Sequence, residues 1–230
     1  MDTEHFRGAV LLCDFDGTIV NIDTAEKALD LFADPSWRRV EEGFERGEVS
    51  FEDSLRKEYA MIAASPESIL KELDRITVLR PHFEKLVEYC KSNQLPLVVV
   101  SGGLEFCIQH FLGRGNWKSF ITIHAPKTRR VGNGYEVTFP KIFKSSSTDF
   151  KEDLVTFHKS RSERVFFIGN GRGDFPAAKQ SNYVFAIKAS KLAQLCKRAG
   201  VACKEIDDFQ EVVDIVSNFG DPSFKNSFIW

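Results

Sequence analysis

The stretch VLLCDFDGTIV (residues 10–20) places two aspartates at the end of an apolar run. The run AVLLC (9–13) has the length and unbroken hydrophobicity of a strand that is buried on both faces. Asp14 and Asp16 follow two positions apart, so their side chains point the same way if the chain stays extended between them. Gly17 comes next and permits close approach of the backbone to a ligand. The stretch therefore predicts a strand of a parallel sheet with an acidic site at its carboxyl end.

The length of the chain, 230 residues, favours one domain, or one domain with an inserted subdomain. Hydrophobic residues make up 43% and charged residues 28%, enough for a sizeable core and a solvated surface. The net charge of -2 gives no reason to expect nucleic-acid binding or adhesion to an anionic membrane. The five cysteines lack zinc-site spacing, the first residues lack a signal-peptide pattern, and no apolar run approaches the roughly 20 residues that cross a bilayer. We expect a cytoplasmic protein, a monomer or homodimer, with no nucleic-acid and no membrane partner.

The hydrophobic pattern changes after the first strand. Residues 21–77 carry apolar side chains at helical spacing in four segments, with no strand signal between them. SFED (50–53) and SPES (65–68) each resemble a helix N-cap followed by an acidic first turn. The sequence therefore predicts a helical insert over 21–77, which interrupts the fold formed by 1–20 and 78–230.

Strands and helices alternate through the rest of the chain. LPLVVVSGG (95–103) and RVFFIGNG (164–171) are typical of buried strands that end in polar residues, and a helix pattern follows each. FITIHAP and YEVTFPKIF flank VGNG (131–134), which predicts a small β-hairpin, and the basic run KTRR (127–130) is expected to be a solvated turn. The alternation predicts an α/β fold with a parallel sheet, in which ligands bind at the carboxyl ends of the strands. Three polar segments, DFDGT, SGG and GNGRGD, should therefore share one site.

The turn GNGRGD (169–174) favours a metal over a dinucleotide. A dinucleotide fingerprint carries Gly or Ala in its sixth place, where this chain has Asp174. Oxygen donors from Asp14, Asn170 and Asp174 suit Mg²⁺. Ser101 and the amides after it could hold an anion, although a simple helix cap would give the same pattern.

Four segments taken together resemble the motifs of the haloacid dehalogenase superfamily, and more narrowly its phosphoserine-phosphatase-like branch. They are DFDGTIV, VVVSGG, Lys151 within DFKEDLV, and GNGRGD, in that order, with the helical insert directly after the first. The resemblance implies a Rossmann-like core with a helical cap. It also implies Mg²⁺-dependent hydrolysis of a small phosphorylated metabolite through an aspartyl-phosphate. The DFDGTIV start and residues 177–200 are also similar to phosphatases of methionine salvage that act on a diketo-methylthiopentyl phosphate.

The resemblance assigns roles to Asp14, Asp16 and Thr18. Asp14 would be the nucleophile, and Asp16 would protonate the leaving alkoxide and then activate water. Thr18 would help to hold the phosphate. The implied metal ligands are Asp14, Asp16 through its backbone carbonyl, Asn170 and Asp174.

The remaining phosphate contacts would come from Ser101, the Gly102 amide and Lys151. Lys144 is an alternative candidate for the lysine role. We prefer Lys151 because it lies on the predicted helix that leads into the strand beginning at Arg164.

Asn170 departs from the family pattern, which has an aspartate in this position. Asparagine keeps a carbonyl oxygen but lacks the negative charge next to a dication. Either Asp174 compensates, or the enzyme is weak, or the chain has left catalysis and is a phosphate-binding or regulatory member of the fold. An engineered substitution that traps a ligand is a further alternative. A dehalogenase is a third reading, but it has no use for Asp16 as acid and base or for a metal.

The cap is expected to close over the cleft at hinges near residues 20 and 78. Substrate-facing residues should then come partly from the insert. Arg56, or Arg38 with Arg39, could meet a carboxylate, and Phe44 could pack against an apolar tail. The candidates are Asn21, Asp23, Thr24, Arg38, Arg39, Phe44 and Arg56.

Overall fold

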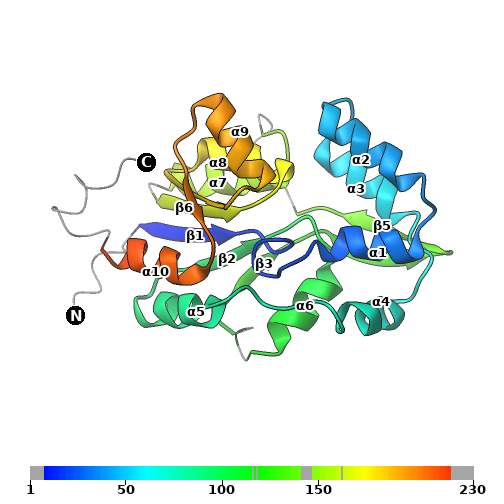
Figure 1. Ribbon diagram of the computed structural model, residues 1–230, viewed down its shortest axis with the longest axis horizontal. Coiled ribbons are helices and arrows are strands. Elements are labelled where there is room, and N and C mark those ends of the chain that lie inside the picture. Colours follow the sequence, from blue (N-terminus) through cyan, green and yellow to red (C-terminus); the bar gives the residue numbers. More distant parts are fainter. Residues whose placement is uncertain (1–7, 116, 118, 141–146, 162, 219–230) are drawn as a thin grey trace.

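Six parallel strands form the central sheet of the computed structural model, in the order β3-β2-β1-β6-β7-β8 (Figure 1). In this order, the first strand along the chain lies near the middle of the sheet, flanked by strands that begin far from it in sequence. The structure describes residues 8–115, 117, 119–140, 147–161 and 163–218. The strands are β1 (Ala9–Cys13), β2 (Leu97–Val100), β3 (Thr122–His124), β6 (Arg164–Gly169), β7 (Tyr183–Ile187) and β8 (Lys204–Ile206).

Apolar side chains alternate between the two faces of this sheet and build a core on each. Leu11 and Phe166 are register partners that belong to one core, and their neighbours Leu12 and Phe167 belong to the other. Both faces are covered by helices (Figure 1), as the predicted α/β fold requires. One face carries α5 (Phe83–Ser92), α6 (Glu105–Gly113) and α10 (Phe209–Ser217), and the other carries α7 (Phe150–Ser160), α8 (Phe175–Gln180) and α9 (Lys191–Ala199).

The insert contains the four helices predicted for 21–77. The Ser50 hydroxyl accepts a hydrogen bond from the Asp53 amide at 3.2 Å, and Ser65 accepts one from Ser68 at 3.3 Å, so both predicted N-caps are confirmed. The helices are α1 (Thr24–Phe32), α2 (Trp37–Arg46), α3 (Phe51–Tyr59) and α4 (Pro66–Leu73).

The two ends of the insert lie side by side. Val20 and Leu79 form an isolated antiparallel bridge, and the Asn21 amide donates to the Val78 carbonyl at 3.0 Å. The Asn21 side chain in turn accepts from the Val78 amide at 2.8 Å. Within the described part of the chain, no helix combines the length and apolar character needed to span a membrane.

The predicted hairpin is present, but the prediction of its first strand was wrong. β4 (Lys127–Val131) pairs with β5 (Gly134–Thr138), so the basic run KTRR is strand and not turn. The turn at Gly132, with a φ of +58°, pairs Val131 directly with Gly134, and the residues just before the turn must then continue the ladder. Thr122–His124 instead extends the main sheet beside β2.

The hairpin packs against the insert. The Tyr135 hydroxyl donates to the Ala64 carbonyl at 2.8 Å, and the Arg130 guanidinium donates to the same oxygen. A Cβ on Gly134 would lie 2.0 Å from the Ala60 carbonyl oxygen, so glycine is required where β5 crosses α3.

Candidate active site

Three strand ends bring the predicted motifs to one edge of the sheet. Asp14 follows β1, Ser101 follows β2 and Asn170 follows β6, as expected from the carboxyl-end rule. A cavity of about 320 Å³ opens there. Seven of the predicted site residues line it, namely Asp14, Asp16, Ser101, Gly102, Lys151, Asn170 and Asp174.

Lys151 joins two of the carboxylates. Its Nζ donates to Asp14 Oδ1 and to Asp174 Oδ1, both at 2.7 Å, and all three side chains are buried. Burial opposes the lysine charge, but the two carboxylates outweigh it and raise the pKa of Lys151. The lysine therefore stays an ammonium inside the cavity. Lys144, the alternative candidate for its role, lies outside the described residues.

Asp14 is buried next to a like charge. Burial and the nearby Asp174 raise its pKa to about 7, although Lys151 lowers it. The Thr18 hydroxyl lies 3.2 Å from its second oxygen, Oδ2. The carboxylate is thus held in place by two neighbours while it faces the cavity, and added positive charge nearby would favour its ionised, nucleophilic form.

Asp16 points toward the insert. Its Oδ1 accepts from the Thr24 amide at 2.8 Å and from the Thr24 hydroxyl at 2.5 Å, and the Ser101 hydroxyl lies 3.4 Å from Oδ2. Burial, followed by the charge of Asp23, raises the pKa of Asp16 well above its usual range. A carboxyl group that retains its proton is able to act as a general acid. The site is tightly packed there, because a Cβ on Gly103 would lie 2.1 Å from Asp16 Oδ2.

Asp174 closes the turn after β6. Its Oδ2 accepts from the Asn170 and Gly171 amides, both at 2.9 Å, while Oδ1 holds Lys151. The Asn170 side-chain oxygen lies 3.1 Å from the Thr18 hydroxyl. The turn is therefore tied both to the lysine and to the loop that follows β1.

Gly17 lies against Asn170 with a φ of +66°, and a Cβ there would be 2.1 Å from Asn170 Nδ2. Gly17→Ala is expected to lower the free energy of unfolding by about 1–2 kcal/mol from the left-handed backbone alone, with a further loss from the clash. Gly132→Ala is the matched control, because Gly132 has a φ of +58° and nothing within 4 Å of a Cβ. Urea denaturation of both variants separates the cost of the left-handed backbone, which the two variants share, from the cost of the clash with Asn170, which only Gly17→Ala has. Equal losses would show that Asn170 moves aside without cost.

The residues present fit a magnesium ion. Asp14 and Asp174 offer carboxylates, Asn170 a side-chain carbonyl and Asp16 a backbone carbonyl, all of them oxygen donors. The buried carboxylates of Asp14 and Asp174 face one ammonium, so their full ionisation leaves one negative charge that a dication could offset. Within the described ranges, no cluster of three or more His, Cys, Asp or Glu side chains is arranged for a metal. The fit therefore depends on the amide and backbone oxygens as well as on two carboxylates.

Two predicted residues lie elsewhere. Thr18 is fully buried and does not line the cavity, but its hydroxyl contacts the side chains of Asp14 and Asn170 and helps to position them. The Arg56 guanidinium pairs with Asp53 at 2.8 Å and lies over the Phe139 ring, away from the cavity lining. Of the other cap candidates, Asp23 and Phe44 line the cavity.

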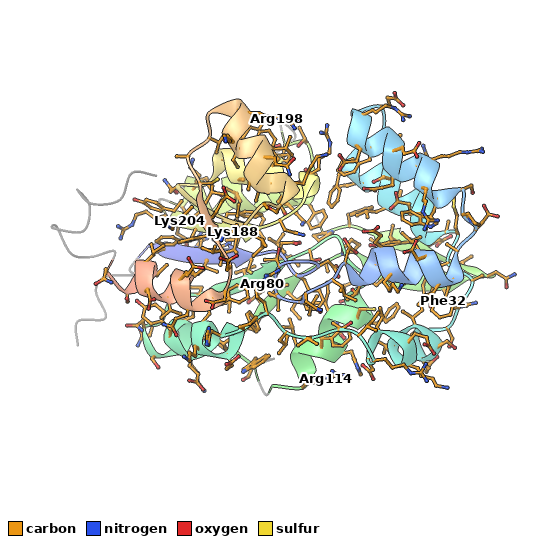
Figure 2. All side chains as sticks on the ribbon, viewed as in Figure 1. Phe32, Arg80, Arg114, Lys188, Arg198 and Lys204 are labelled. Atoms are coloured by element: carbon orange, nitrogen blue, oxygen red, sulfur yellow. The ribbon has the colours of Figure 1, made fainter. Side chains whose placement is uncertain are left out.

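Arg80 is a positioning residue that the sequence reasoning missed. Its guanidinium donates to the Gly17 carbonyl at 2.7 Å and to the Thr18 carbonyl at 2.8 Å (Figure 2). Arg80 comes just after the insert in sequence, so these bonds join the chain that leaves the insert to the loop after β1. Tyr59 was missed as well, and its hydroxyl donates to the Gly102 carbonyl at 2.8 Å. Neither residue belongs to a motif, so only its place after folding identifies it.

Comparisons with known proteins show the family to which the chain is similar. A family model described as haloacid dehalogenase-like hydrolase matches residues 11–179. A 2-hydroxy-3-keto-5-methylthiopentenyl-1-phosphate phosphatase from Exiguobacterium sibiricum is 24% identical over 213 residues, covering 89% of this chain and 94% of that protein. Its counterpart from Geobacillus kaustophilus is 27% identical with the same coverage. Pdp3-interacting factor 1 from Schizosaccharomyces pombe is 23% identical, covering 86% of this chain and 90% of its own.

Solved structures share the fold. A phospho-aspartyl intermediate analogue of phosphoserine phosphatase superposes with a TM-score of 0.64 at 20% identity, covering 90% of this chain and 98% of that one. A phosphoserine phosphatase from T. onnurineus gives a TM-score of 0.67 at 18% identity, covering 95% and 98%. The predicted fold class and the predicted resemblance are both confirmed. The chain belongs to the haloacid dehalogenase-like hydrolase family.

Proposed function

We propose that the chain is a phosphatase, a phosphoric monoester hydrolase, that cleaves a small phosphomonoester through an aspartyl-phosphate on Asp14. The observation that carries this proposal is the buried Lys151 ammonium, which joins Asp14 to Asp174 at the wall of the cavity. That arrangement presents a carboxylate nucleophile beside a positive charge able to receive phosphoryl oxygens. Relatives along most of the chain are named as phosphatases, which supports the same chemistry.

The reaction takes two steps. In the first, an Asp14 oxygen attacks phosphorus, the ester P–O bond breaks, and the Asp16 carboxyl gives its proton to the leaving alkoxide. In the second, Asp16 takes a proton from water, the resulting hydroxide attacks the phosphorus, and phosphate leaves as the Asp14 carboxylate is restored. Lys151, the Ser101 hydroxyl and the Gly102 amide would hold the phosphoryl oxygens throughout.

Magnesium is the proposed cofactor, held by Asp14, Asn170, Asp174 and the Asp16 carbonyl. When bound, it would screen the negative charge between the Asp14 carboxylate and the phosphoryl group. Lys151 is the second cationic group of the site, and its hydrogen bond keeps the Asp14 carboxylate oriented.

Asn170→Asp is expected to tighten Mg²⁺ binding and raise the rate, because it adds a negative charge to a metal ligand. The change should be about 10-fold or more in the metal concentration that gives half-maximal activity, since even indirect ligand contacts are worth 10–100-fold. A magnesium titration of p-nitrophenyl phosphate hydrolysis measures it. Unchanged titration curves would show that Asp174 already supplies the charge that is needed.

A weakened phosphate-binding or regulatory protein is the second candidate, and Asn170 is the observation that favours it. The relative named Pdp3-interacting factor 1 shows that this sequence family includes a protein named for an interaction. Absence of p-nitrophenyl phosphate turnover at every Mg²⁺ concentration, with phosphate binding retained in calorimetry, would support this second candidate. Turnover that requires Mg²⁺ would support the first.

We also propose that 1–20 with 78–230 forms the core and that 21–77 moves as a cap. The paired chain ends at Val20–Leu79 and Asn21–Val78 support a common hinge. The expected result is a smaller radius of gyration by small-angle scattering when phosphate and Mg²⁺ are added, because a closed cap excludes water from the cavity. Identical scattering in both states would contradict closure. The same samples would test the predicted monomer or homodimer, while the cytoplasmic location stays a prediction.

A further inference from the structure

The cap side of the cavity carries a pair of carboxyl groups that the reaction does not use. Glu41 lies on α2 and Glu58 on α3, two helices that pack together. Both line the cavity, and Glu58 is only 3% exposed. Burial, followed by the charge of Glu41, raises the pKa of Glu58 to about 8, while burial and then Glu45 raise that of Glu41 to about 7. Two carboxyl groups in this position are costly unless something else stabilises them.

Two buried polar atoms on the same wall lack a partner among the described residues. They are Glu58 Oε1 and the indole nitrogen of Trp37, a residue that is 3% exposed. Both residues line the cavity. Native structures rarely leave buried donors and acceptors unpaired, so each unpaired atom requires an explanation. A ligand group that donates a hydrogen bond would partner Glu58 Oε1, whereas the Trp37 indole N–H requires an acceptor from another part of a ligand.

The charge of the wall indicates the kind of ligand. Asp23, Glu26 and Glu45 line the cavity beside the pair, and each raises the pKa of one or both of its carboxyls. The cationic residues of the lining are Lys151, Arg172 and Lys191. Lys151 is held by Asp14 and Asp174, Lys191 pairs with Glu45 at 2.5 Å, and Arg172 lies over the Phe44 ring.

An acidic wall repels a carboxylate and attracts a cation. Arg56, expected from the sequence to meet a carboxylate, lies outside the lining. Phe44 and Tyr59 line the same cavity, and the Arg172 guanidinium already lies over the Phe44 ring. Aromatic side chains suit an organic cation better than a strongly hydrated metal ion. The ligand group that fits the wall is therefore an ammonium group carried by an organic molecule.

We infer that the Glu41–Glu58 pair binds an ammonium group of the leaving alcohol, so that the substrate class is the phosphomonoester of an amino alcohol. The inference rests on the proposed function, since the phosphate end is taken to lie at Asp14 and Lys151. Glu58 is the specificity-determining residue in this arrangement. It does not take part in bond breaking.

Binding of two phosphonates tests the inference without requiring turnover. 3-Aminopropylphosphonate has the same chain length as 2-aminoethyl phosphate, and butylphosphonate replaces its ammonium with a methyl group. Calorimetry in the presence of Mg²⁺ should show the amine binding about 10-fold or more tightly than butylphosphonate, as expected for a hydrogen bond to a charged group. Equal affinities, or tighter binding of butylphosphonate, would overturn the inference.

Glu58→Gln should remove this preference. The amide keeps the size of the side chain, and we expect the affinity for the amine to fall about 10-fold while that for butylphosphonate stays within about twofold. Glu42→Gln is the control, because Glu42 is next to Glu41 on α2 but is exposed and absent from the cavity lining. Equal losses for both ligands in Glu58→Gln would assign Glu58 a structural role and overturn the inference.

The pH dependence of the affinity ratio gives a second readout. Because the pKa of Glu58 is raised, the carboxyl is protonated below about pH 8 and must ionise to hold the ammonium group. The ratio of amine to butylphosphonate affinity should therefore rise from pH 6 to pH 8.5, and the shared phosphonate titration cancels in it. A ratio that stays flat in the parent protein, or that rises equally in Glu58→Gln, would overturn the part assigned to Glu58.

Kinetics separates this inference from the proposed function. Higher kcat/KM for 2-aminoethyl phosphate than for propyl phosphate, lost in Glu58→Gln, would support both. Hydrolysis of p-nitrophenyl phosphate without any preference for the amine, or a preference for 2-hydroxy-3-keto-5-methylthiopentenyl-1-phosphate that Glu58→Gln leaves intact, would overturn the inference alone. Selective amine binding with no hydrolysis of any ester would uphold the binding site and reject the phosphatase.

Discussion

Asp14→Asn is expected to leave less than about 1% of the parent kcat/KM for p-nitrophenyl phosphate, because a carboxamide cannot form the acyl phosphate. The substitution keeps the size of the side chain and an oxygen that can accept from Lys151, so the fold should survive. Steady-state kinetics and circular dichroism check both points. Activity above this level in a folded variant would contradict covalent catalysis by Asp14.

Asp16→Asn is the matched control for the same mechanism. p-Nitrophenolate leaves without help from an acid, so this variant should form the phosphoenzyme and then hydrolyse it slowly. Acid quenching with labelled substrate should trap phosphate on Asp16→Asn and none on Asp14→Asn. Label on the Asp14 variant would place the nucleophile elsewhere.

Lys151→Met is expected to lower the free energy of unfolding by about 3–5 kcal/mol, because it leaves buried carboxylates without their counter-charge. Both partners, Asp14 and Asp174, are less than one-tenth exposed. The Lys151→Met variant should also be inactive, because the ammonium is proposed to bind the phosphoryl oxygens. Urea denaturation gives the stability and p-nitrophenyl phosphate turnover gives the activity.

Lys188→Met provides the comparison for a lysine pair in solvent. Lys188, labelled in Figure 2, pairs with Asp207 at 2.9 Å, and both side chains are more than half exposed. Its removal should cost about 1 kcal/mol or less. A loss in Lys151→Met as small as that in Lys188→Met would mean that water or movement of the two carboxylates relieves the buried charge.

Local signals in the chain were sufficient for most elements. The unbroken apolar run of 9–13 identified a buried strand, and the Ser50 and Ser65 caps marked the starts of two insert helices, because these patterns depend on neighbours in sequence. The hairpin was partly mistaken because FITIHAP is as suited to a strand as KTRR. Only pairing with β2 decides where Thr122–His124 belongs. Strand β8 was not predicted, since three residues are too short a pattern.

The candidate site also has features that the sequence predicts and features that only the tertiary structure shows. The sequence by itself determined which residues end the strands, and the carboxyl-end rule then placed Asp14, Ser101 and Asn170 together. The role of Lys151 needed the family resemblance, and its two ion pairs needed coordinates. Only the tertiary structure brought Glu41 close to Glu58 and placed both in the lining of the cavity, because no periodicity links residues on two separate helices. Burial then gave these carboxyls an environment that their sequence neighbours do not reveal.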